Sequence, residues 1–162
     1  MNIKKALLKD KNKATSLYCA KFYQNTILDA AAKVLSNGEK IIQFYEKTAS
    51  DKENIDTAHK LRQLCSMYNA LFIINSRPDI AQIVNADGIC LFDGDMTIKQ
   101  AKEILHDDKI FALEINTLEN ALEGMKFNAD YICITPETKK VLNDNLSVLN
   151  NIKIIKLDRQ FL

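Results

Sequence analysis

The stretch FIINSRPDIAQIVNADGICLFDGD, residues 72–95, contains two short apolar runs, each followed directly by polar side chains. NSR (residues 75–77) follows the first run, and DGD (residues 93–95) follows the second. Nearly continuous apolar runs are typical of parallel strands that are buried on both faces. Because α/β proteins build their sites at the carboxyl ends of such strands, we expect these polar residues to line a site.

The same alternation of apolar runs and helical patterns extends over the rest of the chain. The runs lie at residues 17–20, 41–45, 71–74, 88–92, 110–113, 131–134 and 152–157. Helical patterns lie near residues 24–36, 53–69, 78–84, 97–105, 117–127 and 137–149. This order predicts a repeated β/α unit with right-handed crossovers, either in an open doubly wound sheet or in a (β/α)₈ barrel. No Gly-x-Gly-x-x-Gly follows the first run, which argues against a dinucleotide-binding fold.

Several helix ends are marked by their chemistry. SDKE (residues 50–53) has the spacing of a capping box, in which two side chains satisfy unpaired backbone donors. Thr97 and Thr117 are expected N-caps, and Pro136 suits a first helical turn. Gly38 fits the end of the helix before the second strand.

Composition and charge indicate one globular domain. The chain has 162 residues, 47% of them hydrophobic, and its net charge of +1 gives no bulk attraction to nucleic acid or membranes. Residues 1–13 contain five Lys and one Asp, so we expect a basic N-terminal arm over residues 1–14 and a single (β/α) domain over residues 15–162.

The four cysteines are widely scattered and form no Cys-x-x-Cys pair. No apolar run approaches the length of a membrane span, and the N-terminus lacks the apolar core of a secretory signal. We therefore expect a reduced cytoplasmic protein without disulfides, structural zinc or membrane contact.

Six blocks of sequence resemble a known family in their order and spacing. They are IIQFYEK (41–47), KLRQLCSMYNA (60–70), FIINSRPDIA (72–81), NADGICLFDGD (85–95), KIFALEINTLENAL (109–122) and NADYICITP (128–136). Together they resemble the thiamine phosphate synthase and TenI superfamily, which reads approximately VQLREK, IINDRVDLA, ADGVHLGQED, IGVSTHTLEEA and ADYVGFGP. The resemblance implies a (β/α)₈ barrel and a Mg²⁺-assisted coupling of hydroxymethylpyrimidine pyrophosphate with thiazole phosphate.

The resemblance also implies roles for individual residues. Gln43 matches the pyrimidine-contacting Gln, Lys47 matches the Lys at the pyrophosphate, and Asn75 matches the family Asn. Asp95 preserves the second of two Asp residues that bind Mg²⁺, so we expect a weak metal site there. Lys139 aligns loosely with the Lys of a Thr-Lys segment, which makes it a further candidate for substrate binding.

Four positions depart from the family pattern. Tyr45 replaces an Arg, which removes a charged fork for phosphate oxygens. Ser76 replaces the first metal-binding Asp, Glu114 replaces a pyrophosphate-binding Ser, and Asn116 occupies the place of the TenI His base. The Gly-rich turns that hold the thiazole phosphate in the family have no counterpart before residue 162. The expected fold is therefore an incomplete TIM-barrel-like one, with about seven parallel strands and the last βα unit missing.

An incomplete barrel is expected to leave its first and seventh strands with unpaired edges. Either a homodimer or a partner protein would cover that opening, or the arm at residues 1–13 would fold across it with Ala6, Leu7 and Leu8.

The expected function is that of a degenerate family member, which binds a phosphorylated pyrimidine or thiazole in thiamine metabolism without efficient catalysis. One alternative is an active, Mg²⁺-dependent thiamine phosphate synthase completed by a second chain. The other is a ligand-free structural or regulatory interaction module. Because charge-stabilising groups are altered at several positions, the sequence leaves open whether the chain is an enzyme.

Overall fold

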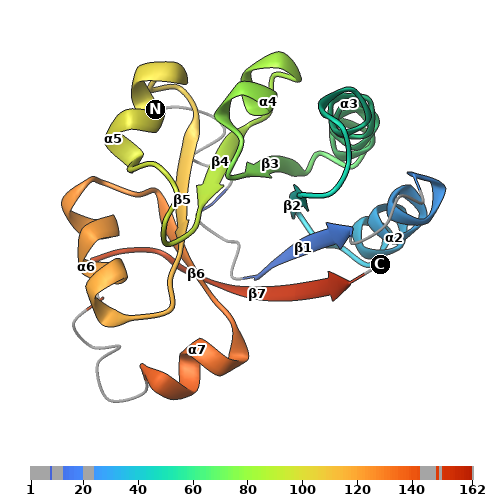
Figure 1. Cartoon of the computed structure of the whole chain (residues 1–162). Helices are drawn as coiled ribbons and strands as arrows, with labels where there is room; N and C mark the ends of the chain where they lie inside the picture. Colours follow the sequence, from blue (N-terminus) through green and yellow to red (C-terminus); the bar gives the residue numbers. More distant parts are fainter. Residues whose placement is uncertain (1–7, 9–12, 20–23, 143–148, 150, 162) are drawn as a thin grey trace.

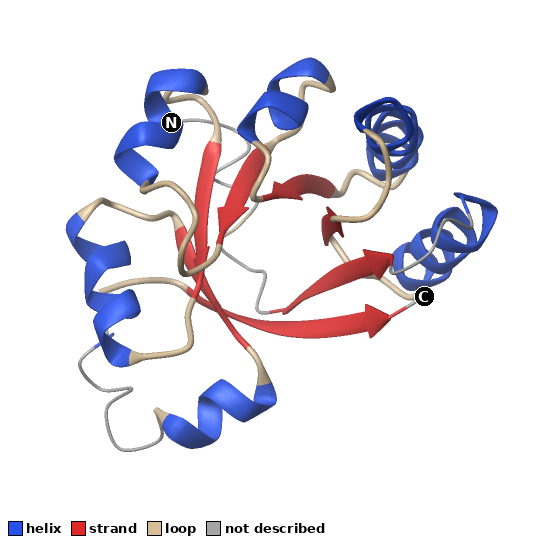
Figure 2. Cartoon of the chain, in the orientation of Figure 1, coloured by secondary structure: helices blue, strands red, loops and turns tan. Residues whose placement is uncertain are grey.

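The computed structural model is a ring of parallel strands surrounded by helices, and it describes residues 8, 13–19, 24–142, 149 and 151–161 (Figure 1). The strands are β1 (Lys13–Cys19), β2 (Ile41–Glu46), β3 (Leu71–Asn75), β4 (Gly88–Leu91), β5 (Ile110–Glu114), β6 (Tyr131–Ile134) and β7 (Ile154–Phe161). The helices are α2 (Gln24–Ser36), α3 (Asp51–Met67), α4 (Pro78–Ile83), α5 (Ile98–Ile104), α6 (Leu118–Lys126) and α7 (Pro136–Val141). Figure 2 shows the strict alternation of strand and helix along the chain. The predicted TIM-barrel-like fold with seven parallel strands is thereby confirmed.

The sheet closes on itself in the order β1-β2-β3-β4-β5-β6-β7. β1 pairs with β7 in parallel, from Lys13 opposite Lys156 to Tyr18 opposite Phe161. The prediction that both strands keep unpaired edges is therefore wrong, and neither a second copy nor an N-terminal helix is required to complete the sheet. Closure removes exposed edges, which are otherwise prone to pair with other chains.

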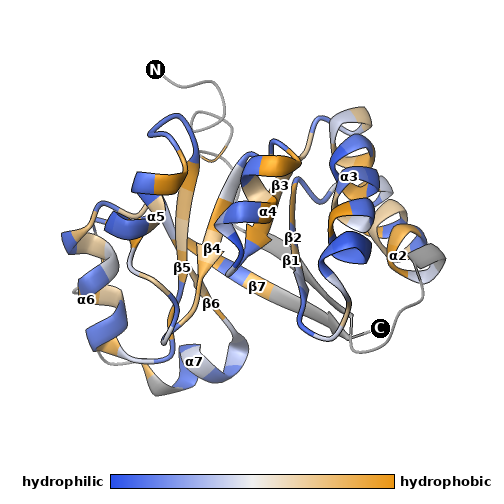
Figure 3. Ribbon diagram, turned by 45° about the horizontal axis from the view of Figure 1, so that its top comes forward, coloured by the Kyte–Doolittle hydropathy of each residue, from blue (hydrophilic) through white to orange (hydrophobic). Residues whose placement is uncertain are grey.

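Alternate residues of the strands fill the inside of the barrel. The buried interior cluster consists of Leu8, Ile41, Leu71, Ile73, Cys90, Ile110, Ala112, Tyr131, Cys133, Ile155 and Leu157. Opposite faces of the same strands pack against the helices, and Figure 3 shows apolar colours on the strands and hydrophilic colours on the outer helix faces. Of the expected N-terminal arm, Leu8 is buried in the interior cluster, whereas residues 1–7 and 9–12 lie outside the described part of the chain.

The helix starts are the ones that the sequence predicts. Ser50 and Glu53 form a complete capping box at α3, and Thr97 forms one with Gln100 at α5. Thr117 caps α6 through the backbone N–H of Asn120. These bonds satisfy donors that a helix leaves unpaired at its first turn, each contributing about 1 kcal/mol. Pro136 begins α7 as expected, whereas part of the helix predicted over 137–149 falls outside the described residues.

The repeated Asn-Ala-Asp sequence ends a helix and starts the next strand in two places. Asn85 and Asn128 have positive φ angles of 50° and 55°, a backbone conformation that Asn tolerates better than most residues. The following Asp87 and Asp130 each accept the backbone N–H of a neighbouring strand, from Phe72 and Phe111, at 2.9 Å. These two hydrogen bonds help to fix the register of β4 against β3 and of β6 against β5.

Gly88 on β4 lies directly opposite Ile110 on β5. A Cβ atom at this position would be 2.2 Å from the carbonyl oxygen of Ile110 and 2.6 Å from the Ile110 Cβ. No side chain fits that space without moving one backbone away from the other. The absence of a side chain at Gly88 therefore allows β4 and β5 to pair at this position.

Cys65 gives the fold a pH dependence. Cys65 lies on the buried face of α3, and this burial raises the pKa of its thiol to about 12, from an ordinary value of 9.0. Because the thiol ionises at lower pH in the unfolded chain, its contribution to stability is complete below pH 9 and is lost as the pH rises toward 12.

We therefore expect the free-energy gap between the wild type and Cys65→Ala to narrow by about 1 kcal/mol per pH unit above pH 9. Denaturant unfolding of both proteins at pH 8, 9.5 and 10.5 measures this gap. A gap that stays constant with pH would contradict the assignment.

Candidate active site at the barrel mouth

Gln43, in the middle of β2, and Asn75, at the carboxyl end of β3, meet inside the barrel. Gln43 is fully buried, and its Nε2 donates to the Tyr131 Oη at 3.2 Å and contacts the Cys133 Sγ at 3.1 Å. Its Oε1 accepts a hydrogen bond of 3.4 Å from the Asn75 Nδ2. Two predicted substrate-binding residues are thus brought together, and Tyr131 and Cys133 of β6 hold Gln43.

The Oδ1 atom of Asn75 has no hydrogen-bond partner, although the residue is only 2% exposed. Such an orphan acceptor costs free energy, typically about 1–3 kcal/mol, and native structures keep few of them. Tyr131 cannot supply a charge nearby, because burial raises its pKa well above the ordinary value. The Asn75 Oδ1 is therefore a neutral, buried acceptor inside the barrel.

Asp95 is held by its own loop and by Ser76. Its Oδ2 accepts a 2.6 Å bond from the Ser76 hydroxyl and a 2.8 Å bond from the backbone N–H of Phe92. Ser76 has a φ of 64°, so a residue other than glycine or Asn occupies the left-handed region at this turn. The Ser76 hydroxyl thus fixes the Asp95 carboxylate in place.

Tyr45 and Phe92 form an aromatic pair beside this loop. Their ring centroids lie 5.1 Å apart with an interplanar angle of 67°, an edge-to-face arrangement. Tyr45 lies on β2 and Phe92 directly follows β4, so the pair joins the two strands that flank β3. The exposed Lys47 places its Nζ 5.2 Å from the centre of the Tyr45 ring.

The remaining predicted positions are spread more widely. Lys139 is exposed on α7, after β6, and nothing in the described geometry brings it to Gln43 or Asn75. Glu114 ends β5 beside Cys133 and is 2% exposed, so its carboxylate belongs to the buried layer of the mouth. Asn116 is exposed just beyond that strand.

The described residues do not form a complete set of protein ligands for Mg²⁺, so Asp95 would hold the ion only together with water or the phosphate oxygens of a ligand. Mg²⁺ prefers an octahedron of hard oxygen ligands, usually with one or two carboxylates. In the part of the chain that the structure describes, no three His, Cys, Asp or Glu side chains gather in a way that could hold a metal ion. Asp95 already uses Oδ2 for two hydrogen bonds, and Ser76 contributes a hydroxyl that is spent on that carboxylate.

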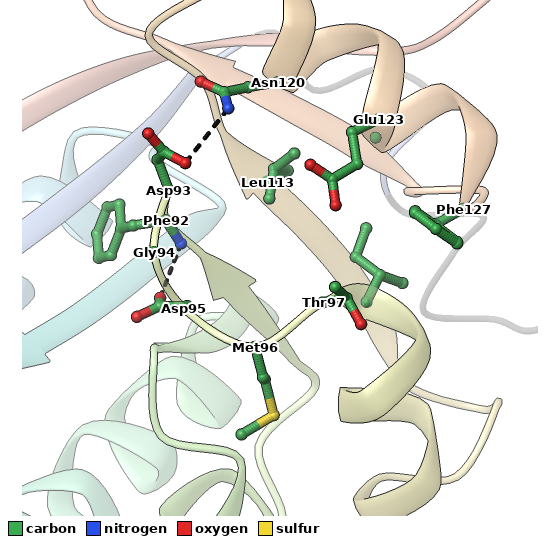
Figure 4. A pocket seen from close by; sticks show the side chains of 12 residues that line it. Phe92, Asp93, Gly94, Asp95, Met96, Thr97, Leu113, Asn120, Glu123 and Phe127 are labelled. Carbon is green, nitrogen blue, oxygen red and sulfur yellow. Dashed lines mark hydrogen bonds between the residues drawn. The ribbon is translucent and has the colours of Figure 1, made fainter.

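A cavity of about 130 Å³ lies outside the barrel, between the loop after β4 and helix α6. It is lined by Phe92, Asp93, Gly94, Asp95, Met96, Thr97, Ile98, Leu113, Asn120, Glu123, Gly124 and Phe127. Figure 4 shows the side chains of Phe92 and Asp95 on the far side of this loop from Glu123 and Phe127. The cavity therefore shares a loop with the mouth but contains neither Gln43 nor Asn75.

Phe92 is the mouth residue that the sequence prediction missed. In the family pattern ADGVHLGQED the corresponding position is a Gly, so the substitution is readable from the sequence. Its meaning depends on Tyr45, however, because only the fold brings the two rings into contact.

Comparison with known proteins supports the expected family. A family model described as thiamine monophosphate synthase matches residues 17–154. A thiamine-phosphate synthase of Dictyoglomus thermophilum is 37% identical over 82% of this chain and 60% of its own length. One from Prochlorococcus marinus subsp. pastoris is 32% identical over 90% of this chain and 41% of its own length.

The fold agrees with the solved structure of a thiamine phosphate pyrophosphorylase from Pyrococcus furiosus. The TM-score is 0.75 at 28% identity, covering 93% of this chain and 76% of that one. The chain therefore spans roughly half the length of the curated relatives that it matches. Because the family model covers most of the sequence, the chain belongs to the thiamine monophosphate synthase family.

Proposed function

We propose that the chain is a ligand-binding member of this family in thiamine biosynthesis, which takes a phosphorylated pyrimidine or thiazole without coupling them efficiently. The observation that supports this most is the Gln43–Asn75 pair, whose buried acceptor on Asn75 lacks a partner. A site that keeps an unsatisfied polar atom at the mouth of a barrel is suited to a ligand that supplies the missing donor. The expected cytoplasmic location is part of the same proposal.

The residues expected to contact phosphate and metal support the loss of efficient catalysis. Tyr45 gives no permanent charge where the family has Arg, and Ser76 bonds to Asp95 instead of offering a second carboxylate. Losing a single preorganised group that stabilises charge commonly lowers a rate by about 10²–10³.

An active synthase is the second candidate, favoured by the identity of 37% to a thiamine-phosphate synthase. In that case Mg²⁺ would be required, and a second chain or a further segment would supply the missing grip on the thiazole phosphate. In this alternative, Asp95 is the described residue that we assign to Mg²⁺.

The test combines binding with turnover. Thermal unfolding with hydroxymethylpyrimidine pyrophosphate or thiazole phosphate measures binding, and a coupling assay with Mg²⁺ measures synthesis of thiamine phosphate. We expect stabilisation by a pyrimidine form, with coupling at least about 10²-fold below that of a full-length synthase.

Complementation of a synthase-deficient strain separates the alternatives. Rescue together with rapid coupling would establish the active synthase and contradict the proposal. Failure of every precursor to stabilise the protein would leave an interaction module. If Mg²⁺ adds to stabilisation, Asp95→Ala should abolish that increment, and an unchanged increment would remove Asp95 from the metal site.

A further inference from the structure

The outer cavity, between the loop after β4 and helix α6, takes no part in the proposed function. Its volume of about 130 Å³ is close to that of an apolar cavity of about 150 Å³ that was engineered into another protein and holds one benzene molecule. The outer cavity is therefore large enough for a single ring of five or six atoms.

The inner wall of the outer cavity is apolar. Leu113 of β5 points toward the helices, since it packs against both buried clusters outside the barrel, and it lines this wall. Ile98 and Gly124 line the cavity as buried residues, whereas Leu113, Met96 and Phe127 are only half-buried. A ring placed here would remove further apolar surface from water, which favours binding.

The rim of the outer cavity is acidic. Asp93, in the loop after β4, and Glu123, on α6, are exposed carboxylates, and Figure 4 shows them on opposite sides of Leu113. The Asn120 Nδ2 donates to the Asp93 Oδ1 at 3.5 Å, which links this carboxylate to α6. None of the twelve lining residues is Lys, Arg or His, so the lining attracts a cation and offers an anion no partner.

Phe127 adds an aromatic wall, and aromatic faces attract cations. Lys126 already places its Nζ 5.4 Å from the centre of the Phe127 ring, although it does not line the cavity. In the described part of the chain, no three His, Cys, Asp or Glu side chains gather in a way that could hold a metal ion. Carboxylates at the rim of an apolar wall therefore suit an organic cation better than a metal ion.

We propose that the outer cavity binds a small organic cation built on a single aromatic ring. The ring lies against Leu113, and the charged group lies between Asp93 and Glu123. This site is separate from the barrel mouth, since neither Gln43 nor Asn75 lines it, and the inference does not depend on the proposed function.

A ¹⁵N-correlated NMR titration with three probes tests this inference. The probes are benzylammonium, benzyl alcohol, which lacks the charge, and methylammonium, which lacks the ring. We expect benzylammonium to bind with a Kd of about 1 mM and to shift the side-chain NH₂ signal of Asn120 and the backbone N–H signals of Gly94 and Gly124. Each of the other probes should bind at least about fivefold more weakly, because each lacks one part of the interaction.

Glu123→Gln removes one carboxylate and keeps the shape of the side chain. This variant should bind benzylammonium about threefold more weakly and benzyl alcohol as before, because only the charged probe loses an attraction. Glu119→Gln is the matched control, since Glu119 is an exposed carboxylate on the same helix and does not line the cavity. Both side chains are exposed, so both variants are expected to fold.

Three results would contradict the inference. Equal affinities for benzylammonium and benzyl alcohol, or an unchanged affinity in Glu123→Gln, would show that the site does not select a cation. Equal affinities for benzylammonium and methylammonium would show attraction to surface charge without use of the cavity. Shifts at the side-chain amides of Gln43 and Asn75, with Asn120 unmoved, would place the cation at the barrel mouth instead.

Discussion

Gly88→Ala is expected to lower the free energy of unfolding by about 3 kcal/mol, or to prevent folding altogether. The added Cβ would stand 2.2 Å from the carbonyl oxygen of Ile110, which belongs to the backbone and cannot swing aside. Relieving this overlap requires β4 and β5 to separate, and in a closed sheet the separation spreads to the neighbouring strands. Urea unfolding followed by circular dichroism gives the change.

Gly124→Ala is the matched control for that substitution. A Cβ at Gly124 would meet the Ile132 Cγ2 and the Leu113 Cδ2 at 3.4 Å, which is ordinary van der Waals contact. Because Gly124 lies inside α6, alanine should raise stability by about 0.5–1 kcal/mol through reduced backbone entropy of the unfolded chain. Equal effects of the two substitutions would show that the β4–β5 approach is not the cause.

Asn75→Leu is expected to abolish stabilisation by the pyrimidine ligand, with a loss of affinity of at least about tenfold. The substitution removes the unpartnered Oδ1 that we assign to the ligand, and leucine keeps the same branching and number of side-chain heavy atoms. The cost to the free protein should be about 1–3 kcal/mol, because the unsatisfied acceptor on Asn75 disappears while the buried Gln43 Oε1 loses its 3.4 Å bond. Thermal unfolding with and without the pyrimidine measures both quantities.

Asn54→Leu controls for the general effect of removing a buried amide. Asn54 lies on α3, is 3% exposed, and also has an unpartnered Oδ1. Its replacement should change stability by a comparable amount and leave the ligand-induced shift intact. A ligand shift that survives in Asn75→Leu would instead make Asn75 an ordinary core residue.

The strand and helix order was predictable because each element carries its own local signal. The capping box at Ser50 and the glycine at Gly38, whose φ is +95°, act within a few residues and are readable from spacing. Continuous apolar runs such as β3 identified parallel strands, since both of their faces are buried. These signals do not depend on distant parts of the chain.

Closure of the barrel was not predictable from such signals. Counting strands against the eight of a TIM barrel led to the wrong expectation of two open edges. Whether seven strands close depends on their tilt and stagger, which are collective properties of the sheet. Gly88 is one local feature of this geometry, because it leaves no Cβ between β4 and the backbone of Ile110 on β5.

The candidate site was predictable only in part. Asn75 stood out as a polar residue after an apolar run, and Gln43 was predicted from the family resemblance; the structure brings them into contact. The bond from Ser76 to Asp95 and the ring contact at Tyr45 join residues far apart in sequence. Lys139 was predicted because its residue type matches the family. That match does not say where the side chain lies relative to Gln43, and the structure places Lys139 on α7.

Side-chain amide signals in a ¹⁵N-correlated NMR titration with hydroxymethylpyrimidine pyrophosphate test the central claim most directly. The account predicts that the NH₂ signals of Gln43 and Asn75 shift together as ligand is added, while that of Asn120 in the outer cavity stays in place. A titration that moves Asn120 and leaves Gln43 and Asn75 unchanged would contradict a ligand site at the barrel mouth.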